Sequence, residues 1–361
     1  MKCVLGCLMC IFSLFIFAQQ SVTLFENVVF YDMYDDPVND STTPSTVHRF
    51  SNTLVAYPVS KMNLGQVTDS VKLQVTITAR CDNYDRLAHV FLVLAPKKSS
   101  CYNPDSVSRI ELARFITPFM NKNVKPDQVT FHFSANELSA IMKHSNVSNK
   151  YRLWIELAVF GVPYAAQKQV KGCEGRKDVF EAKMELVTFE NQTKKAPKMN
   201  LIPVISNYHI NNYQIEATDS IGKTCKTFSF ETKKALKKAT VYLISSNHGA
   251  NEGGEEYIRR WHFVSLDGKD IFSYKPGGKS CEPYRFRNTQ KNGIYEFEEK
   301  SEEEWTSWNN WCPGDEVPIR KIELQNVTKG KHCITISVPD AQFVDMQGYF
   351  PISMYILGTK N

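Results

Sequence analysis

Residues 71–79 read VKLQVTITA, with apolar and polar side chains in strict alternation. Successive side chains of a strand point to opposite faces of a sheet, so this segment predicts a strand with one buried face. The apolar run HVFLVL at residues 89–94 predicts the next strand. Between them, the segment Cys81–Arg86 (CDNYDR) becomes a loop at a strand end, where binding and catalytic residues are commonly carried. An ordinary polar turn is the alternative interpretation.

Short runs of the same kind recur along the chain, separated by turn signals. A capping box at Ser134–Glu137 predicts one short helix. Residues 22–60 are polar, and only short strand-like pieces are expected there. Many short strands with little helix are typical of antiparallel sandwiches. Further strands are expected at residues 128–133, 151–159, 183–189, 201–205, 226–230, 239–245, 261–266, 332–339 and 350–357.

The segment at residues 190–198 is polar, charged and contains a proline, which predicts a linker. A length of 361 residues fits two domains of ordinary size. We therefore predict an all-β protein with two side-by-side antiparallel jelly-roll or β-sandwich domains, at residues 21–195 and 196–361. Asp267-Gly268 is expected to form a hairpin turn in the second domain.

The first twenty residues have the features of an export signal. Lys2 is followed by an apolar stretch to Phe17, which predicts a signal peptide at residues 1–20. No later segment is apolar enough for a transmembrane helix. The net charge of +5 is spread over the chain, so no nucleic-acid partner is expected, and charge runs such as Glu302–Glu304 are expected to be solvated loops. We expect a secreted or periplasmic protein, monomeric and not bound to a membrane.

Seven cysteines follow the predicted signal peptide, and an exported protein is expected to form disulfides from them. The odd number leaves at least one thiol outside a disulfide. The mature region has no Cys-x-x-Cys pair and no closely spaced histidine pair, so neither a metal nor another cofactor is predicted. The seven are Cys81, Cys101, Cys173, Cys225, Cys281, Cys312 and Cys333.

A glycine-bearing loop at residues 247–257 runs into paired carboxylates, Glu255 and Glu256, at the expected start of a strand. Only one of two adjacent strand side chains can face a given cleft. His248 stands near the beginning of the same loop. A solvated loop without function is the alternative.

A tryptophan cluster and a lone glutamate complete the candidates. Trp305, Trp308 and Trp311 lie beside Cys312, and flat aromatic faces suit stacking on sugars, although a disulfide-anchored corner would look similar. Glu156 lies in the apolar run LWIELAVF and faces either solvent or a cleft, which the period of two cannot decide. Carboxylates from three separate stretches with aromatic platforms favour metal-free acid–base hydrolysis of a sugar-linked bond.

The same residues resemble those of the peptide-N-glycosidase F family. Cys81–Arg86 and the segment ARFITPF at residues 113–119 resemble its N-terminal domain. Other segments resemble its C-terminal domain. They are Glu255-Glu256-Tyr257, the loop containing Cys281, and WCPG at 311–314 followed by VPIR at 317–320. The motifs occur in the family's order from about Val71 to the end of the chain.

The resemblance implies two jelly-roll-like domains with the site at their interface. It implies hydrolysis of the amide between N-acetylglucosamine and asparagine in N-glycosylated proteins or glycopeptides. The glycan would leave intact as a glycosylamine, aspartate would remain on the peptide, and no metal or other cofactor would be used.

The resemblance also implies roles for individual residues. Asp85 takes the place of the principal catalytic aspartate, Glu256 that of a glutamate acting through water, and Glu156 that of a third acidic residue. Because the three carboxylates are expected to cluster, at least one pKa should be raised, which supplies a proton for the leaving nitrogen. The residues assigned to substrate binding are Arg86, Tyr84, Trp311, Trp308 and His248, and the disulfide tying the tryptophan loop is assigned to Cys281 and Cys312.

Several positions depart from the family pattern. Trp308 replaces an arginine, and Ala158 replaces a tryptophan two residues after the third acidic position. Cys81 lacks its usual nearby partner, for which Cys101 is the best substitute. Two other hypotheses therefore stand beside the amidase: a non-catalytic glycan-binding protein on the same scaffold, and a copper-dependent monooxygenase, which would need histidine pairs that the chain lacks.

Overall fold

A computed structural model describes residues 19–59, 70–97, 101–143, 145–189, 199–291 and 294–360. The apolar part of the predicted signal peptide and the predicted linker at residues 190–198 lie outside these ranges, and so does the proposed domain boundary.

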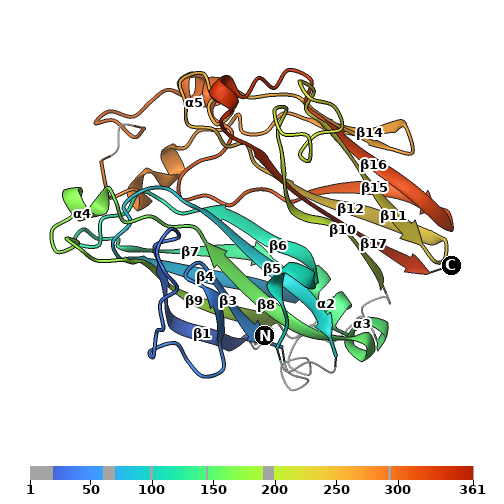
Figure 1. The fold of residues 1–361 in the computed structure, drawn as a ribbon, viewed down its shortest axis with the longest axis horizontal. Helices are drawn as coiled ribbons and strands as arrows, with labels where there is room; N and C mark the ends of the chain where they lie inside the picture. The colour runs from blue at the N-terminus through green and yellow to red at the C-terminus, as the bar shows by residue number, and fades with distance from the viewer. Residues whose placement is uncertain are drawn as a thin grey trace, which may run out of the picture.

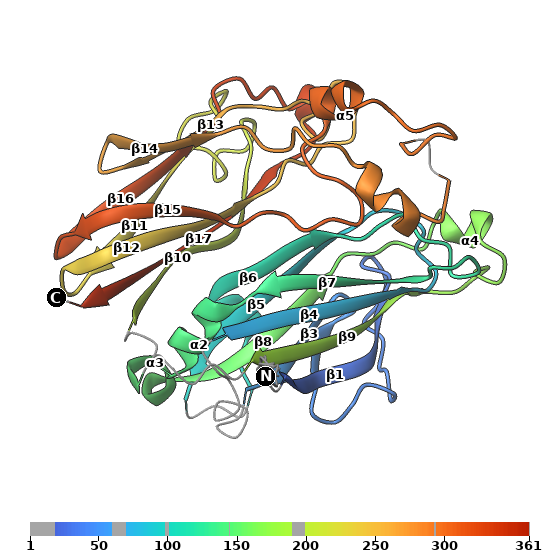
Figure 2. The same ribbon diagram turned by 180° about the vertical axis from the view of Figure 1, so that it is seen from behind.

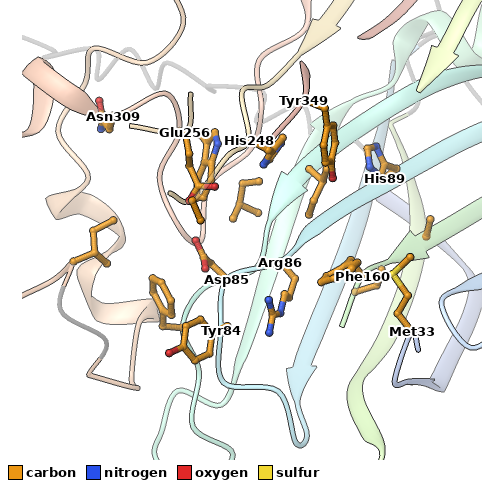
Figure 3. A pocket seen from close by; sticks show the side chains of 18 of the residues that line it. Met33, Tyr84, Asp85, Arg86, His89, Phe160, His248, Glu256, Asn309 and Tyr349 are labelled. Carbon is orange, nitrogen blue, oxygen red and sulfur yellow. The ribbon is translucent and has the colours of Figure 1, made fainter. Parts of the chain in front are cut away.

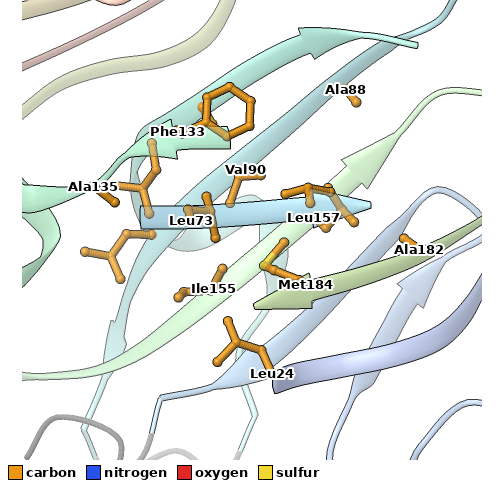
Figure 4. Packing of buried hydrophobic residues seen from close by; sticks show 14 of the residues in the cluster. Leu24, Leu73, Ala88, Val90, Phe133, Ala135, Ile155, Leu157, Ala182 and Met184 are labelled. Carbon is orange, nitrogen blue, oxygen red and sulfur yellow. The ribbon is translucent and has the colours of Figure 1, made fainter. Parts of the chain in front are cut away.

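The first half of the chain is a sandwich of two antiparallel sheets (Figures 1 and 2). Figure 4 shows part of the core between them, with Leu73, Val90, Ile155 and Met184 packed together. The four-stranded sheet has the order β1 (Gln19–Tyr31), β9 (Asp178–Phe189), β4 (Ser70–Ala79), β7 (Gln128–Ser134). The five-stranded sheet has the order β2 (His48–Ser51), β3 (Leu54–Pro58), β8 (Tyr151–Val159), β5 (Leu87–Pro96), β6 (Ser108–Ile116).

The sequence patterns explain how β4 and β5 sit in this sandwich. Along β4, Leu73, Val75 and Ile77 are fully buried, whereas Lys72 is exposed, as the alternation predicts. β5 is buried on both faces. One face of β5 packs into the core of the sandwich, and the other carries residues that line the interface with the second half. A continuous apolar run is what a strand covered on both sides requires.

The second half is a second antiparallel sandwich with its own core. Asp267 and Gly268, with φ angles of 50° and 80°, form the predicted turn between β13 (His262–Leu266) and β14 (Lys269–Tyr274). One sheet has the order β10 (Met199–Ile210), β17 (Phe350–Lys360), β12 (Leu236–Ser245), β15 (Arg320–Val327). The other has the order β11 (Cys225–Thr232), β16 (Gly330–Ser337), β13 (His262–Leu266), β14 (Lys269–Tyr274).

The helices are short and lie outside the sheets (Figure 1). The predicted short helix is confirmed as α2 (Asn136–Lys143), although Ser134, the expected cap, is the last residue of β7. The expectation of a solvated loop at Glu302–Glu304 is wrong, because a capping box between Ser301 and Glu304 starts α5 (Glu302–Trp308). The remaining helical turns are α3 (Ser145–Lys150), α4 (Ala166–Gln169), and the 3-10 segments η1 (Pro104–Ser106), η2 (Glu282–Arg287) and η3 (Val344–Met346).

The two sandwiches lie side by side, joined by backbone hydrogen bonds along β6 (Figure 2). The Ile116 amide donates to Asp315 O at 3.0 Å, and Val317 donates to Arg114 O at 2.8 Å. Two of the family-like segments, 113–119 and 311–320, therefore contact each other directly. The predicted all-β class with two side-by-side antiparallel jelly-roll sandwiches is confirmed. No helix in the described ranges is long and apolar enough to cross a membrane.

Candidate active site

A cavity of about 710 Å³ lies between the two sandwiches and is lined by residues from both. Figure 3 shows the carboxyl groups of Asp85 and Glu256 lying close together, with Arg86, His248 and Tyr349 around them. The sequence-predicted residues that the structure brings to this cavity are Tyr84, Asp85, Arg86, His248, Glu256 and Trp311. The side chain of Trp308 lies outside the described part of the structure.

Asp82 holds the loop that presents Asp85. Its buried carboxylate accepts hydrogen bonds from the Tyr84 and Val162 amides at 3.0 and 2.7 Å. It also accepts two from Arg86, from Nε at 2.7 Å and from Nη2 at 3.1 Å. Four hydrogen bonds on one carboxylate fix the loop, because a buried acceptor left unpaired would cost stability. Asp82 is therefore the structural aspartate of the loop, and Asp85 is the one left for the cavity.

The carboxyl group of Asp85 has a strongly raised pKa. Burial, followed by the nearby Glu256 carboxylate, raises the pKa of Asp85 to about 8, although the Arg86 guanidinium acts in the opposite direction. A carboxylic acid with such a pKa is largely protonated at neutral pH and can donate a proton.

Glu256 reaches the cavity from a tight turn, not from the start of a strand as the sequence suggested. Asn310 Nδ2 ties the turn by donating to the backbone oxygens of Glu255 at 3.0 Å and Glu256 at 2.7 Å. Gly254 is required in this turn, because a Cβ there would collide with the Gly249 carbonyl oxygen. Burial raises the pKa of Glu256 to about 7, and the Gly249 amide, 3.5 Å from Oε2, opposes this shift.

The side chain of the neighbouring Glu255 is held by hydrogen bonds inside the protein. Its carboxylate is fully buried and accepts bonds from Arg260 Nε and Nη2, both at 3.0 Å. The Gln342 amide donates to it at 2.7 Å. Of the two adjacent glutamates, only Glu256 lines the cavity.

Aromatic side chains form part of the cavity wall. Trp311 Nε1 donates to Asn247 O at 2.9 Å, and its ring lies 5.7 Å from the His248 ring. Tyr84 packs edge-on against Phe119, with ring centroids 5.7 Å apart. These surfaces suit the apolar faces of sugar rings.

A buried polar network that the sequence did not reveal links the two halves beside the cavity. Glu111 accepts bonds from Arg114 at 2.8 and 2.7 Å and is bonded to His89 Nδ1 at 2.8 Å. Arg114 Nη1 also donates to Ser246 Oγ at 3.0 Å, and Ser246 Oγ bonds His248 Nε2 at 2.8 Å. Arg114 belongs to the quoted ARFITPF segment, but nothing in the one-dimensional pattern showed that its partners come from both halves.

The neighbours of Glu111 and His248 in this network explain the pKa shifts of both residues. Burial alone would raise the pKa of Glu111, but Arg114 and His89 lower it to about 2. Burial, with Arg114 and His89 nearby, holds the pKa of His248 well below its ordinary value. The imidazole of His248 is therefore neutral at physiological pH, and Ser246 fixes its orientation.

The structure does not bring Glu156 to Asp85 and Glu256. Its fully buried carboxylate accepts bonds from Arg109 Nε at 2.6 Å and Nη2 at 2.9 Å. The Tyr102 hydroxyl donates to it at 2.7 Å. Glu156 lines a different cavity, whereas Ala158, two residues further along β8, lines both.

Two disulfides fix loops near the cavity. Cys281 and Cys312 are bonded, as the resemblance implied, and tie the loop that precedes η2 to the one containing Trp311. The suggested Cys81–Cys101 pair is wrong, because Cys81 is bonded to Cys173, which follows α4. Cys101, Cys225 and Cys333 are outside both disulfides. Within the described ranges, no three His, Cys, Asp or Glu side chains are grouped to hold a metal ion.

Comparison with known proteins identifies the relatives of this chain. Residues 21–174 match the family model "Peptide-N-glycosidase F, N terminal", and residues 216–357 match "Peptide-N-glycosidase F, C terminal". No curated protein sequence matches the chain.

The solved structures agree on the fold. One structure of PNGF-II superimposes with a TM-score of 0.70 at 18% identity, covering 95% of this chain and 66% of that one, so this chain spans just under two thirds of that relative. PNGase F, described as a glycosylasparaginase from Flavobacterium meningosepticum, gives a TM-score of 0.58 at 14% identity, covering 95% of this chain and 96% of that one. With both family models matched in order and the fold shared throughout, the chain belongs to the peptide-N-glycosidase F family.

Proposed function

We propose that this protein is an amidase that hydrolyses the bond between N-acetylglucosamine and the asparagine side chain in N-glycoproteins or glycopeptides. The observation that carries the proposal is the pair of carboxyl groups, Asp85 and Glu256, which line one cavity from different halves with pKa values of about 8 and about 7. Between these two pKa values such a pair holds about one proton, so one group can give a proton while the other accepts one.

In the proposed reaction, Glu256 accepts a proton from water as the water oxygen attacks the carbonyl carbon of the asparagine side chain. The carbon–nitrogen bond then breaks, and Asp85 donates its proton to the leaving nitrogen. The products are aspartic acid in the peptide and the intact glycan as a glycosylamine. The proton that Glu256 gained restores Asp85 through solvent, so the pair returns to its starting state.

The remaining residues of the cavity would hold the substrate. Trp311 and Tyr84 offer ring faces to sugars, and Arg86 and neutral His248 offer hydrogen-bond donors and acceptors. Arg86 is already held by Asp82 and lies 5.4 Å from the Tyr84 ring centroid, so little side-chain entropy would be lost on binding.

The proposal is tested by incubating a denatured glycoprotein with the protein and measuring the former glycosylation sites by mass spectrometry. Conversion of asparagine to aspartate that disappears in Asp85→Asn supports it. Asp270→Asn, at an exposed position on β14, is the matched control and keeps the activity. Intact glycans after long incubation with folded protein count against an amidase, and retained glycan binding in that experiment selects the glycan-binding hypothesis.

Export is part of the proposal as well. The Cys81–Cys173 and Cys281–Cys312 disulfides fit an oxidising compartment, as the predicted signal peptide does. If export is correct, N-terminal sequencing of protein collected from the periplasm or culture medium begins after the predicted signal peptide. An N-terminus that retains residues 1–20 would contradict it.

A further inference from the structure

The outer sheet of the second sandwich carries two exposed aromatic rings. Figure 2 shows β13 and β14 of this sheet on the side of the molecule away from the first sandwich, whereas β10 and β17 of the other sheet contact β6. Phe263 lies on β13, and Trp261 immediately precedes the strand. Their exposed fractions are 41% and 47%, whereas His262 and Val264 are fully buried. Because side chains alternate between the two faces of a strand, both rings lie on the outer face.

The two rings lie close to each other. Their centroids are 6.5 Å apart, and their planes are inclined by 30°. Single exposed apolar side chains are ordinary on a protein surface, but two large rings side by side form a continuous apolar surface. The face of an aromatic ring is electronegative and attracts the polarised C–H groups on the apolar face of a sugar ring. Trp261 and Phe263 therefore offer a surface on which sugar units can stack.

Short hydroxyl side chains surround this ring pair on the sheet. Phe263 is paired with Ser273 of β14 on one side and with Ser337 of β16 on the other. Short side chains leave the rings accessible from the solvent, and hydroxyls both donate and accept hydrogen bonds, as sugar hydroxyls do. The next row across β13, β16 and β11 also consists of hydroxyl side chains: Ser265, Thr335 and Thr227.

An exposed carboxylate lies over β11 on the same face. Asp219 Oδ2 accepts a hydrogen bond from Thr227 Oγ1 at 2.9 Å and a weak one from Cys225 Sγ at 3.9 Å. A carboxylate can accept about four hydrogen bonds, so Asp219 keeps capacity for sugar hydroxyls. Cys225 is paired with Ser337, which places it two strands, or about 10 Å, from Phe263. A short oligosaccharide can therefore contact the rings and the carboxylate together.

We propose that the platform formed by Trp261, Phe263, Ser337 and Asp219 is a second carbohydrate-binding site, which takes neutral oligosaccharides. None of these four residues lines the cavity between the two sandwiches. The platform is thus a separate site, and its binding does not depend on the proposed reaction. If the proposed function is correct, the platform holds one glycan of a multiply glycosylated substrate while the cavity acts on another, which raises the effective concentration of the substrate.

A protein partner or a second copy of this chain fits the platform less well. The cores of protein–protein interfaces are depleted in serine and enriched in arginine, methionine and further aromatic residues. On this face, both positions paired with Phe263 are serines, Ser273 and Ser337. A ring pair flanked by short hydroxyl side chains matches a small polyhydroxylated ligand better than a broad protein surface.

The test follows the indole N–H signals of protein labelled with nitrogen-15 in tryptophan while a free oligomannose N-glycan is added. The signal of Trp261 is identified by its absence in Trp261→Phe. We expect this signal to shift saturably, and Phe263→Ala to raise the Kd read from it about three- to tenfold, as for the loss of one aromatic contact. Asp219→Asn should also raise this Kd, because an amide has one acceptor oxygen in place of two. A disialylated glycan should bind more weakly than the oligomannose glycan, because the Asp219 carboxylate repels its charges.

A matched control removes an exposed aromatic ring elsewhere on the surface. Phe297 is exposed and does not belong to the platform, so Phe297→Ala should leave the Kd unchanged. All the variants alter exposed side chains and should keep the wild-type Tm. Trp261→Ala should also leave kcat/KM unchanged for a peptide with a single glycan, because Trp261 does not line the cavity that holds Asp85 and Glu256.

Several outcomes overturn the inference: a Trp261 signal that does not move, a Kd that is unchanged in both Phe263→Ala and Asp219→Asn, or a Kd that rises equally in Phe297→Ala. A wild-type dimer in analytical ultracentrifugation that dissociates in Trp261→Ala also overturns it, because a second copy then covers the platform. If the wild-type protein cleaves no glycopeptide, the proposed function fails, but the titration still decides whether the platform binds sugar.

Discussion

Burial, and after it the carboxylate of Glu256, raises the pKa of Asp85, although Asp85 and Glu256 belong to different sandwiches and meet only across the cavity between them. Backbone hydrogen bonds between β6 and residues 314–317 join the two halves that carry this pair. The following predictions examine this pair and the groups that hold it in place.

The rate should have a bell-shaped dependence on pH. Below about pH 6 both carboxyl groups are protonated and the base is lost, and above about pH 9 both are ionised and the acid is lost. With pKa values of about 8 for Asp85 and about 7 for Glu256, kcat/KM should be greatest between these values. Steady-state kinetics on a glycopeptide from pH 5 to 10 would check this, and a flat profile over that range would show that these groups do not titrate in the rate-determining step.

Replacing Asp85 with Asn should stabilise the folded protein at high pH. The raised pKa means that folding favours the protonated acid, so this stability is present below about pH 4 and is lost as the pH rises through about 8. Asp85→Asn has no charge to bury, so its advantage should grow over that range to about 2 kcal/mol, allowing for partial solvent screening. Thermal unfolding of both proteins at several pH values is the measurement. A difference in stability that does not change with pH would contradict a raised pKa of Asp85 in the folded protein.

Substitution of one adjacent glutamate should lower activity, and substitution of the other should lower stability. Glu256→Gln removes the proposed base and should lower kcat about 100-fold or more, with little change in Tm. Glu255→Gln weakens the pair with Arg260 and should lower the free energy of unfolding by about 2 kcal/mol. Urea unfolding and initial rates on the same preparations distinguish the two. If Glu255→Gln proves to be the inactive and stable variant, the assignment of the two residues is reversed.

Substitutions of Arg114 and Glu111, which are paired in the buried network, should have non-additive effects on stability. Arg114→Met leaves the Glu111 carboxylate buried without its main partner and should cost about 3–5 kcal/mol. Adding Glu111→Gln should recover part of that loss, because the uncompensated charge is gone. Lys321→Met breaks the more exposed pair with Glu137 and should change stability by less than about 1 kcal/mol. Additive effects of the Arg114 and Glu111 changes would mean that the two do not act as a pair.

Much of the fold could be predicted because local patterns were consistent with it. The alternation in residues 71–79 predicted β4, the apolar run at 89–94 predicted β5, and Asp267-Gly268 predicted the β13–β14 turn. β1 was missed at its full length of 13 residues, because three register shifts interrupt its regular pairing with β9. A capping box at Ser301–Glu304 was present in the sequence and could have revealed α5.

The candidate site was harder to predict, because its residues come from segments that are far apart in the chain. The resemblance brought Asp85 and Glu256 together, and both line the cavity. A period of two could not show that Glu156 would pair with Arg109 of β6 and line a second cavity. The Cys81–Cys173 pairing could not be predicted either, since Cys173 is brought to Cys81 only by the fold of the intervening chain.

The most direct test of the central claim is the fate of the water oxygen when a glycopeptide is cleaved in water enriched with oxygen-18. If Asp85 and Glu256 direct water to the asparagine carbonyl carbon, mass spectrometry will find one heavy oxygen in the new aspartate and none in the glycosylamine as it is released. Heavy oxygen entering the sugar during cleavage, or a peptide that keeps its asparagine, would contradict the account.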